Sequence, residues 1–116
     1  LSTLTVNLFK DLKYTQAAGK ETLRLKPPAI FLFLETLNEK VTLSNGIVLD
    51  EREFVFVNTD GLHYDPITFP EPEKFNPNRW LDADERKLVE MESSFLPFGF
   101  GPRICPGMNL ANLEIA

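Results

Sequence analysis

The fold of this chain is decided by one stretch near its end, Pro97-Phe98-Gly99-Phe100-Gly101-Pro102-Arg103-Ile104-Cys105-Pro106-Gly107. The stretch contains the only cysteine of the 116 residues. Its fixed spacing is Phe-x-x-Gly-x-Arg-x-Cys-x-Gly, which ordinary residue usage would produce in a chain this short with odds on the order of one in a hundred thousand. The pattern is therefore treated as a functional motif.

Cys105 is a candidate metal ligand, because the thiolate form of cysteine binds metals. Residues 108–116 follow it with apolar side chains spaced as in an amphipathic helix, including Leu110 and Leu113. Cys105 is then expected just before a helix N-terminus, where free backbone N–H groups favour an anion. The alternative is a buried cysteine that acts as a small apolar side chain, the usual role of a lone cysteine.

Four neighbours of Cys105 are candidate cofactor-binding residues. Gly101 and Gly107 allow positive φ and a close approach of the backbone to a flat ligand. Arg103 can bind a carboxylate through its bidentate fork. Phe98 can form an apolar wall that keeps water from the sulfur.

A second motif is Glu21-Thr22-Leu23-Arg24, in a run from residue 12 to residue 25 that the apolar spacing predicts to be helical. The run ends at Pro27-Pro28, which cannot continue a helix. Glu21 and Arg24 are three residues apart and can pair on one helix face. An exposed pair of this kind would be worth about 1 kcal/mol at most.

A third motif, Pro77-Asn78-Arg79-Trp80, closes a segment rich in prolines and aromatic residues that begins at Phe69. The prolines predict a loop without regular structure over residues 69–80, with its rings packed on a neighbour.

Together, the three motifs in this order resemble the cytochrome P-450 family. The resemblance implies that Cys105 is the axial thiolate ligand of a haem b iron, which favours O–O cleavage. It also implies that Arg103 meets a haem propionate. Glu21, Arg24 and Arg79 would form a buried structural triad, although Asn78 stands where the family more usually has Glu. Breaking a buried charge network of this kind typically costs about 3–5 kcal/mol.

The segment between the first two motifs is predicted to be rich in strands. Residues 29–34 form an apolar run of strand length, which the resemblance places beside the haem and substrate; a buried strand is the equally weighted alternative. Leu34 and Glu35 replace a basic residue that many relatives use for a propionate. Residues 41–49 predict a hairpin around Asn45-Gly46, and residues 54–57 predict a further strand.

The charged segment of residues 82–92 and the single histidine also bear on function. Residues 82–92, with Arg86-Lys87, are interpreted as a solvated polar loop rather than a docking patch. His63 is the only histidine, so a metal cluster of several histidines cannot be built. A catalytic pair of Cys105 and His63 has no local support.

Composition and net charge limit the classes of protein and of partner that suit this chain. Hydrophobic residues make up 43% and charged residues 25% of the chain, which predicts a packed core. A net charge of −5 argues against nucleic acid or an acidic membrane as the main partner. A single cysteine excludes an internal disulfide. No signal peptide, transmembrane stretch or repeat is evident in the sequence.

We therefore expect an α+β fragment of the mainly α cytochrome P-450 fold. Residues 1–116 would be the C-terminal part of a single domain, truncated at both ends. The parent would be a haem-thiolate monooxygenase that inserts one atom of O2 into a small hydrophobic substrate with electrons from a reductase, and the isolated fragment is expected to be inactive. The alternatives are a haem-thiolate isomerase or dehydratase and a non-catalytic remnant. Localisation is unknown; an endoplasmic reticulum membrane would suit the parent.

Overall fold

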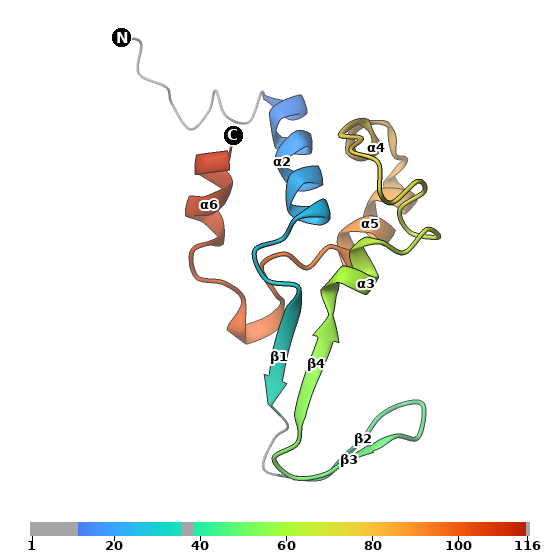
Figure 1. Cartoon of the computed structure of the whole chain (residues 1–116), viewed down its shortest axis with the longest axis vertical. Helices are drawn as coiled ribbons and strands as arrows, with labels where there is room; N and C mark the ends of the chain where they lie inside the picture. The colour runs from blue at the N-terminus through green and yellow to red at the C-terminus, as the bar shows by residue number, and fades with distance from the viewer. Residues whose placement is uncertain (1–11, 36–38, 116) are drawn as a thin grey trace.

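A computed structural model describes residues 12–35 and 39–115 of the chain (Figure 1). Within these residues no helix combines the length and the apolar character needed to cross a membrane. The elements in chain order are α2 (Lys13–Leu25), β1 (Phe31–Glu35), β2 (Val41–Thr42), β3 (Val48–Leu49), β4 (Phe54–Asn58), α3 (Thr59–His63), α4 (Asn78–Asp82), α5 (Glu85–Ser94), the 3-10 turn η1 (Gly101–Arg103) and α6 (Met108–Ile115).

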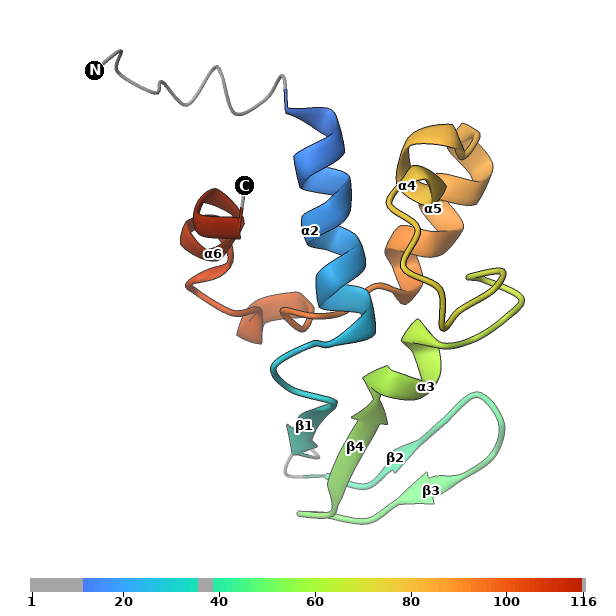
Figure 2. The same cartoon turned by 45° about the horizontal axis from the view of Figure 1, so that its top comes forward.

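Helix α2 is the central element, with α6 on one side and α4 and α5 on the other (Figure 2). It confirms the helix predicted over residues 12–25 and ends just before Pro27. The backbone N–H of Lys26 closes its last turn on the carbonyl of Thr22 at 2.8 Å. Its buried positions are Ala17, Gly19, Glu21 and Arg24. A helix with a buried Glu and a buried Arg needs polar partners from elsewhere in the chain.

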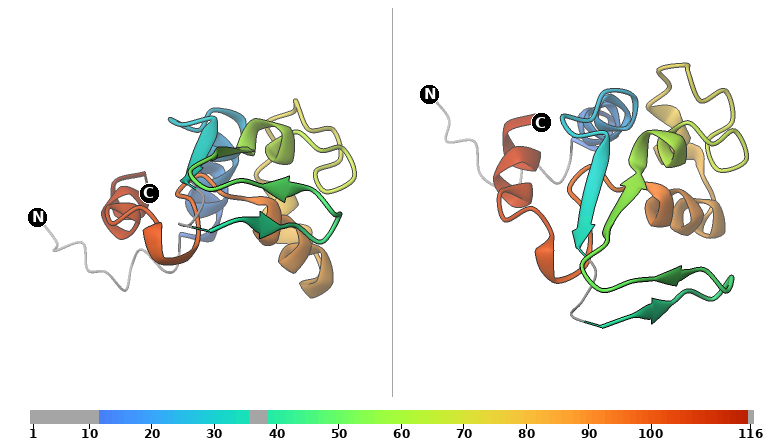
Figure 3. Two further views of the ribbon diagram at one scale, coloured as in Figure 1. Left: turned by 90° about the horizontal axis from the view of Figure 1, so that it is seen from below. Right: turned by 60° about the horizontal axis from the view of Figure 1, so that its bottom comes forward.

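The strands form two small antiparallel pairs. β1 pairs with β4, with Phe31 opposite Asn58 and Glu35 opposite Phe54. β2 and β3 form the predicted hairpin, in which Gly46 has φ 86°. This hairpin extends away from the helices (Figure 3). The first pair lies close to α2 and is the one that bears on the site described below.

The apolar core lies between α2, α4 and α5. Phe69 packs against Trp80 with ring centroids 5.9 Å apart, and Trp80 packs against Phe95 at 5.0 Å. The side chain of Met91 is 1% exposed. Among the residues that the structure describes, the buried apolar side chains are Ala17, Phe69, Trp80 and Met91, with Ala83, Leu88 and Phe95 packed against them.

Two of the expected loops contain helices. Residues 82–92, predicted to be a polar loop, instead form most of α5, because Asp84 caps it by accepting a hydrogen bond from the N–H of Lys87 at 2.7 Å. Leu88 and Met91 then face the core at helical spacing. The predicted loop over residues 69–80 likewise ends in α4, since a proline is tolerated where a helix begins.

Helix α6 confirms the helix predicted after Cys105. It packs against α2, where a Cβ placed on Gly19 would lie only 2.5 Å from Cγ2 of Ile115. Glycine at this position therefore allows the close contact of the two helices. Leu110 and Leu113 are exposed, so these two apolar residues of the helix do not contribute to a core among the described residues.

Candidate functional site

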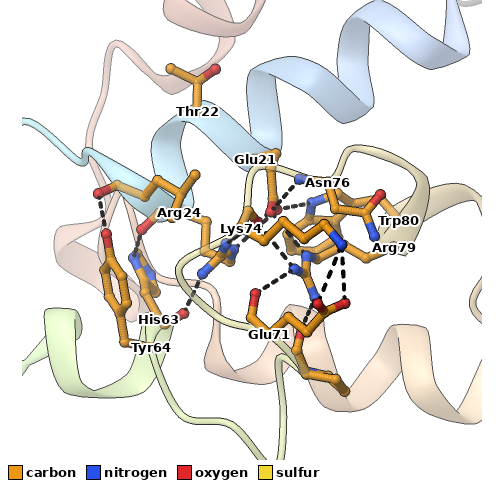
Figure 4. A network of polar contacts seen from close by, with 12 residues as sticks. Glu21, Thr22, Arg24, His63, Tyr64, Glu71, Lys74, Asn76, Arg79 and Trp80 are labelled. Carbon is orange, nitrogen blue, oxygen red and sulfur yellow. Dashed lines mark hydrogen bonds and ion pairs between the residues drawn. The ribbon is translucent and has the colours of Figure 1, made fainter.

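The carboxylate of Glu21 is the centre of a buried polar network that joins α2 to the segment around α4 (Figure 4). Nε and Nη2 of Arg24 donate to it at 3.0 and 2.8 Å, and Nε of Arg79 donates at 2.9 Å. The indole N–H of Trp80 donates at 2.9 Å and the backbone N–H of Asn76 at 3.1 Å. We call these five residues the Glu21 network. The structure thus brings together the three residues of the expected triad.

Arg79 uses its remaining donors to hold the proline-rich segment in place. Nη1 donates to the carbonyl of Pro70 at 2.9 Å, and Nη2 lies 3.3 Å from the carbonyls of Glu71 and Lys74. Nη2 of Arg24 also approaches the carbonyl of Lys74, at 3.4 Å. The two guanidinium groups therefore donate to three carbonyls of this irregular segment, of which that of Glu71 also accepts from the N–H of Lys74 at 3.0 Å.

The charge state of Glu21 follows from these contacts. Burial opposes its ionisation, but the hydrogen bonds from Arg24, Asn76, Arg79 and Trp80 outweigh burial and lower the pKa of Glu21 below its ordinary value. The ionised carboxylate is flanked by two arginines, and both side chains of the Glu21–Arg24 pair are fully buried. The network is thus compensated internally and leaves no open position on Glu21 for a ligand.

His63 lies beside this network and is fully buried. Its Nδ1 is 3.1 Å from the carbonyl oxygen of Arg24, while Nη1 of Arg24 donates to the carbonyl of His63 at 2.8 Å. Its Nε2 accepts a hydrogen bond from the backbone N–H of Leu96 at 3.0 Å. Burial is the main cause that lowers the pKa of His63. With both ring nitrogens engaged elsewhere, His63 does not form a catalytic pair with Cys105.

The stretch around Cys105 (residues 97–107, here the Cys105 loop) is held by backbone contacts. The N–H of Cys105 donates to the carbonyl of Phe98 at 2.9 Å, and the carbonyl of Cys105 accepts from the N–H of Met108 at 3.2 Å, at the start of α6. Gly99 has φ 77°, and a Cβ placed on it would lie 3.7 Å from Leu32 of β1. The loop therefore runs beside β1, while its thiol is free and exposed.

The predicted cofactor-binding residues fit a flat, carboxylate-bearing group. Gly101 has φ 70° and no atom near its missing Cβ, and a Cβ on Gly107 would be in contact with the Cys105 sulfur at 3.8 Å. Glycine at position 107 thus leaves space beside the thiol, whereas glycine at position 101 accommodates the positive φ of the loop. Arg103 is exposed, and within residues 12–35 and 39–115 its side chain has neither an ion pair nor a hydrogen bond. Phe98 is half-buried.

Residues 12–35 and 39–115 contain no group of three His, Cys, Asp or Glu side chains that could hold a metal ion. A single thiol is an insufficient ligand set for a bare metal ion, which typically takes four or more ligands. One protein thiolate does suit an iron whose other ligands come from a macrocycle. The donor chemistry of the described residues therefore fits a haem.

The sequence did not point to three members of this arrangement. Trp80, the only tryptophan, stands next to Arg79 in a predicted aromatic loop, but no residue pattern predicts that its indole N–H donates to Glu21. Asn76 contributes only its backbone, which no residue pattern predicts. His63 reaches Leu96 across 33 positions of sequence, and such a contact has no spacing signature. The side chains of Leu34 and Glu35 lie outside what the structure describes.

Known proteins similar to this chain agree with its motifs. The profile of the family described as Cytochrome P-450 matches residues 2–116. The chain is 42% identical over 100 residues to cytochrome P-450 monooxygenase 76AD131 of Lophophora williamsii, with 86% of this chain and 20% of the relative covered. It is 44% identical over 109 residues to tabersonine 16-hydroxylase 1 of Catharanthus roseus, with coverage of 90% and 21%. It is 43% identical over 112 residues to salutaridine synthase of Papaver somniferum, with coverage of 92% and 22%. The chain spans about a fifth of the length of these relatives.

Proposed function

Because this chain belongs to the cytochrome P-450 family, we propose that it is the C-terminal, haem-binding part of a single-domain haem-thiolate monooxygenase. The observation that carries the proposal is the exposed thiol of Cys105 just before α6, beside Gly107, whose missing side chain leaves space next to the sulfur. The parent would insert one atom of O2 into a small hydrophobic substrate with electrons from a reductase.

In this proposal the residues of the Cys105 loop bind and orient the haem. Cys105 would supply the thiolate ligand of the iron, and the positive end of the dipole of α6 would favour its negative charge. Arg103 binds a propionate through its fork. Phe98 limits the access of water to the sulfur, and Gly101 and Gly107 let the backbone approach the ring. Haem ligated by a thiolate supplies the capacity to activate O2.

The Glu21 network has a structural role in the proposal. Its charges are paired inside the protein, so it has no group left to donate or accept a proton at a substrate. It fixes α2 to the segment around α4, and α2 in turn packs against α6. The network thereby supports the helix that follows Cys105.

An isotope experiment on the intact protein tests the reaction class. With a reductase, NADPH and a panel of apolar compounds under 18O2, a monooxygenase incorporates one 18O atom into the product. A product formed from an organic peroxide without reductant, and without label from O2, would establish the isomerase or dehydratase alternative. A protein that holds haem through Cys105 but converts no compound by either route would favour the non-catalytic remnant.

A further inference from the structure

We propose that His63 is a positioning residue that connects the Cys105 loop to the Glu21 network through its neutral Nδ1–H tautomer. The inference rests on the proposed function, because it gives the loop its importance as the carrier of the iron ligand. It adds a residue that touches neither the sulfur nor the Glu21 carboxylate.

The tautomer follows from the two partners of the ring. A backbone N–H can only donate, so the nitrogen that faces Leu96, Nε2, must carry a lone pair. A backbone carbonyl can only accept, so the nitrogen that faces Arg24, Nδ1, must carry the proton. An imidazolium would place a second N–H against the N–H of Leu96 and lose that hydrogen bond.

The contact at Leu96 lies where the Cys105 loop begins. The carbonyl of Leu96 accepts a hydrogen bond from Gly99 at 3.2 Å, and the carbonyl of Phe98 accepts one from Cys105 at 2.9 Å. Fixing the N–H of Leu96 therefore fixes the first of two successive backbone contacts that lead to the thiol. The ring of Phe95, 5.5 Å from that of His63, packs beside the same contact.

The other end of the connection is equally defined. His63 and Arg24 exchange two hydrogen bonds, one from each side chain to the other residue's carbonyl. Arg24 also forms the buried pair with Glu21. A displacement of α2 or of the Glu21 network is thus transmitted to Leu96 through one rigid ring.

The surroundings of His63 keep the ring neutral. Burial lowers the pKa of His63 and outweighs the hydrogen bond to the carbonyl of Arg24, which raises it; the guanidinium of Arg24 on α2 acts in the same direction as burial. Asp60, on the same helix as His63, acts in the opposite direction. The segment of residues 95–105 contains no carboxylate, so no carboxylate of this segment competes with His63 as the titrating group.

Hydrogen exchange of the intact holoprotein tests the proposal without a measurement of activity. In His63→Phe, which keeps an aromatic ring at this position and removes both hydrogen bonds of the imidazole, the peptide spanning residues 95–105 should exchange about three- to tenfold faster than in the wild type. The matched variant His63→Gln can still accept from Leu96 and should restore most of the protection. Equal exchange of this peptide in the wild type and in His63→Phe would overturn the proposal.

A pH series on the wild type keeps the test valid even if a variant fails to fold. After correction for intrinsic exchange rates, protection of residues 95–105 should fall once the pH passes below the lowered pKa of His63. His63→Gln, which cannot be protonated in this range, should lack that step. A wild type without the step, or a glutamine variant with the same step, would contradict the proposal.

The absorption spectrum of the reduced CO complex separates this inference from the proposed function. If Cys105 is not the ligand, the thiolate band is absent in the wild type, whatever the exchange shows. If Cys105 is the ligand but His63 has no positioning role, the band is present and changes neither in His63→Phe nor at low pH. The proposal predicts that the band weakens in both cases and is retained in His63→Gln.

Discussion

The Glu21 network and the Cys105 loop differ in the burial and the pairing of their polar side chains. In the network, an acid and two arginines are removed from water, and hydrogen bonds inside the protein satisfy the Glu21 carboxylate. In the loop, Cys105 and Arg103 are exposed, and Arg103 has no partner among residues 12–35 and 39–115. This comparison supports our proposal that the network serves the fold and that the loop presents groups for a ligand.

The strongest way to break this comparison is Glu21→Ala in the intact protein. The substitution removes the acceptor of five hydrogen bonds and leaves the buried charge of Arg24 without its counter-ion. We expect a loss of about 3–5 kcal/mol in the free energy of unfolding, measured by denaturant titration. Arg79→Ala should act in the same direction.

Glu92→Ala is the matched control, because Glu92 also pairs with a basic side chain, Lys20, but at the surface. Its side chain is 50% exposed, and its loss should cost about 1 kcal/mol or less. Comparable costs for Glu21→Ala and Glu92→Ala would show that the Glu21 network is not the structural centre of this region.

A pair of conservative substitutions sharpens the contrast between the two arginines. Arg24→Lys keeps the charge but loses the fork that binds Glu21 and the carbonyl of His63, so the free energy of unfolding should fall by about 2–3 kcal/mol. Arg103→Lys should leave the free energy of unfolding of the haem-free protein within about 0.5 kcal/mol of the wild type. It should instead weaken haem retention. Denaturant titration and haem loss to an acceptor protein measure the two effects, and reversed results would contradict the assignment.

Gly101→Ala tests the backbone of the loop. Gly101 has φ 70°, so alanine should cost about 1–2 kcal/mol although there is space for its Cβ. Gly107→Ala, with no positive φ and a Cβ close to the sulfur, should have a smaller effect on thermal stability and a larger one on haem content. Equal thermal stability of Gly101→Ala and the wild type would show that the loop is not held in this conformation.

The pH dependence of the free energy of unfolding should show a smaller effect that distinguishes His63 from Glu21. The lowered pKa of His63 means that the unfolded chain binds more protons below the ordinary histidine value of about 6.5. Stability should therefore decrease as the pH falls from 6.5 through the folded pKa. The part contributed by Glu21, whose pKa is also lowered, should persist to more acidic pH and be lost as the pH falls through its own folded pKa. Unfolding curves of the wild type and His63→Gln measure this difference, and identical pH dependence above pH 5 would contradict it.

The sequence predicted the elements whose signals are local. Helix α2 was bounded by Pro27, and the hairpin β2–β3 was set by Asn45-Gly46. The polar loop expected over residues 82–92 was wrong, because the cap at Asp84 and the buried Met91 outweighed a mostly charged composition.

The candidate site likewise has some contacts that the sequence predicts and others that it does not. The motifs placed Glu21, Arg24 and Arg79 together through the resemblance, and the geometry agrees. The link from His63 to Leu96 could not be predicted, since it depends on how α3 packs against the end of α5. The assigned roles of Cys105 and Arg103 remain predictions, because their partner would be a ligand rather than another residue of the chain.

The most direct test of the central claim is the spectrum of the reduced CO complex of the intact protein with Cys105→Ser, recorded beside its far-ultraviolet circular dichroism. We expect the variant to keep the fold of the wild type, because the thiol is exposed and the Glu21 network is untouched. We also expect the red-shifted Soret band of a thiolate-ligated haem to be lost. A folded Cys105→Ser protein that keeps this band would show that Cys105 is not the ligand.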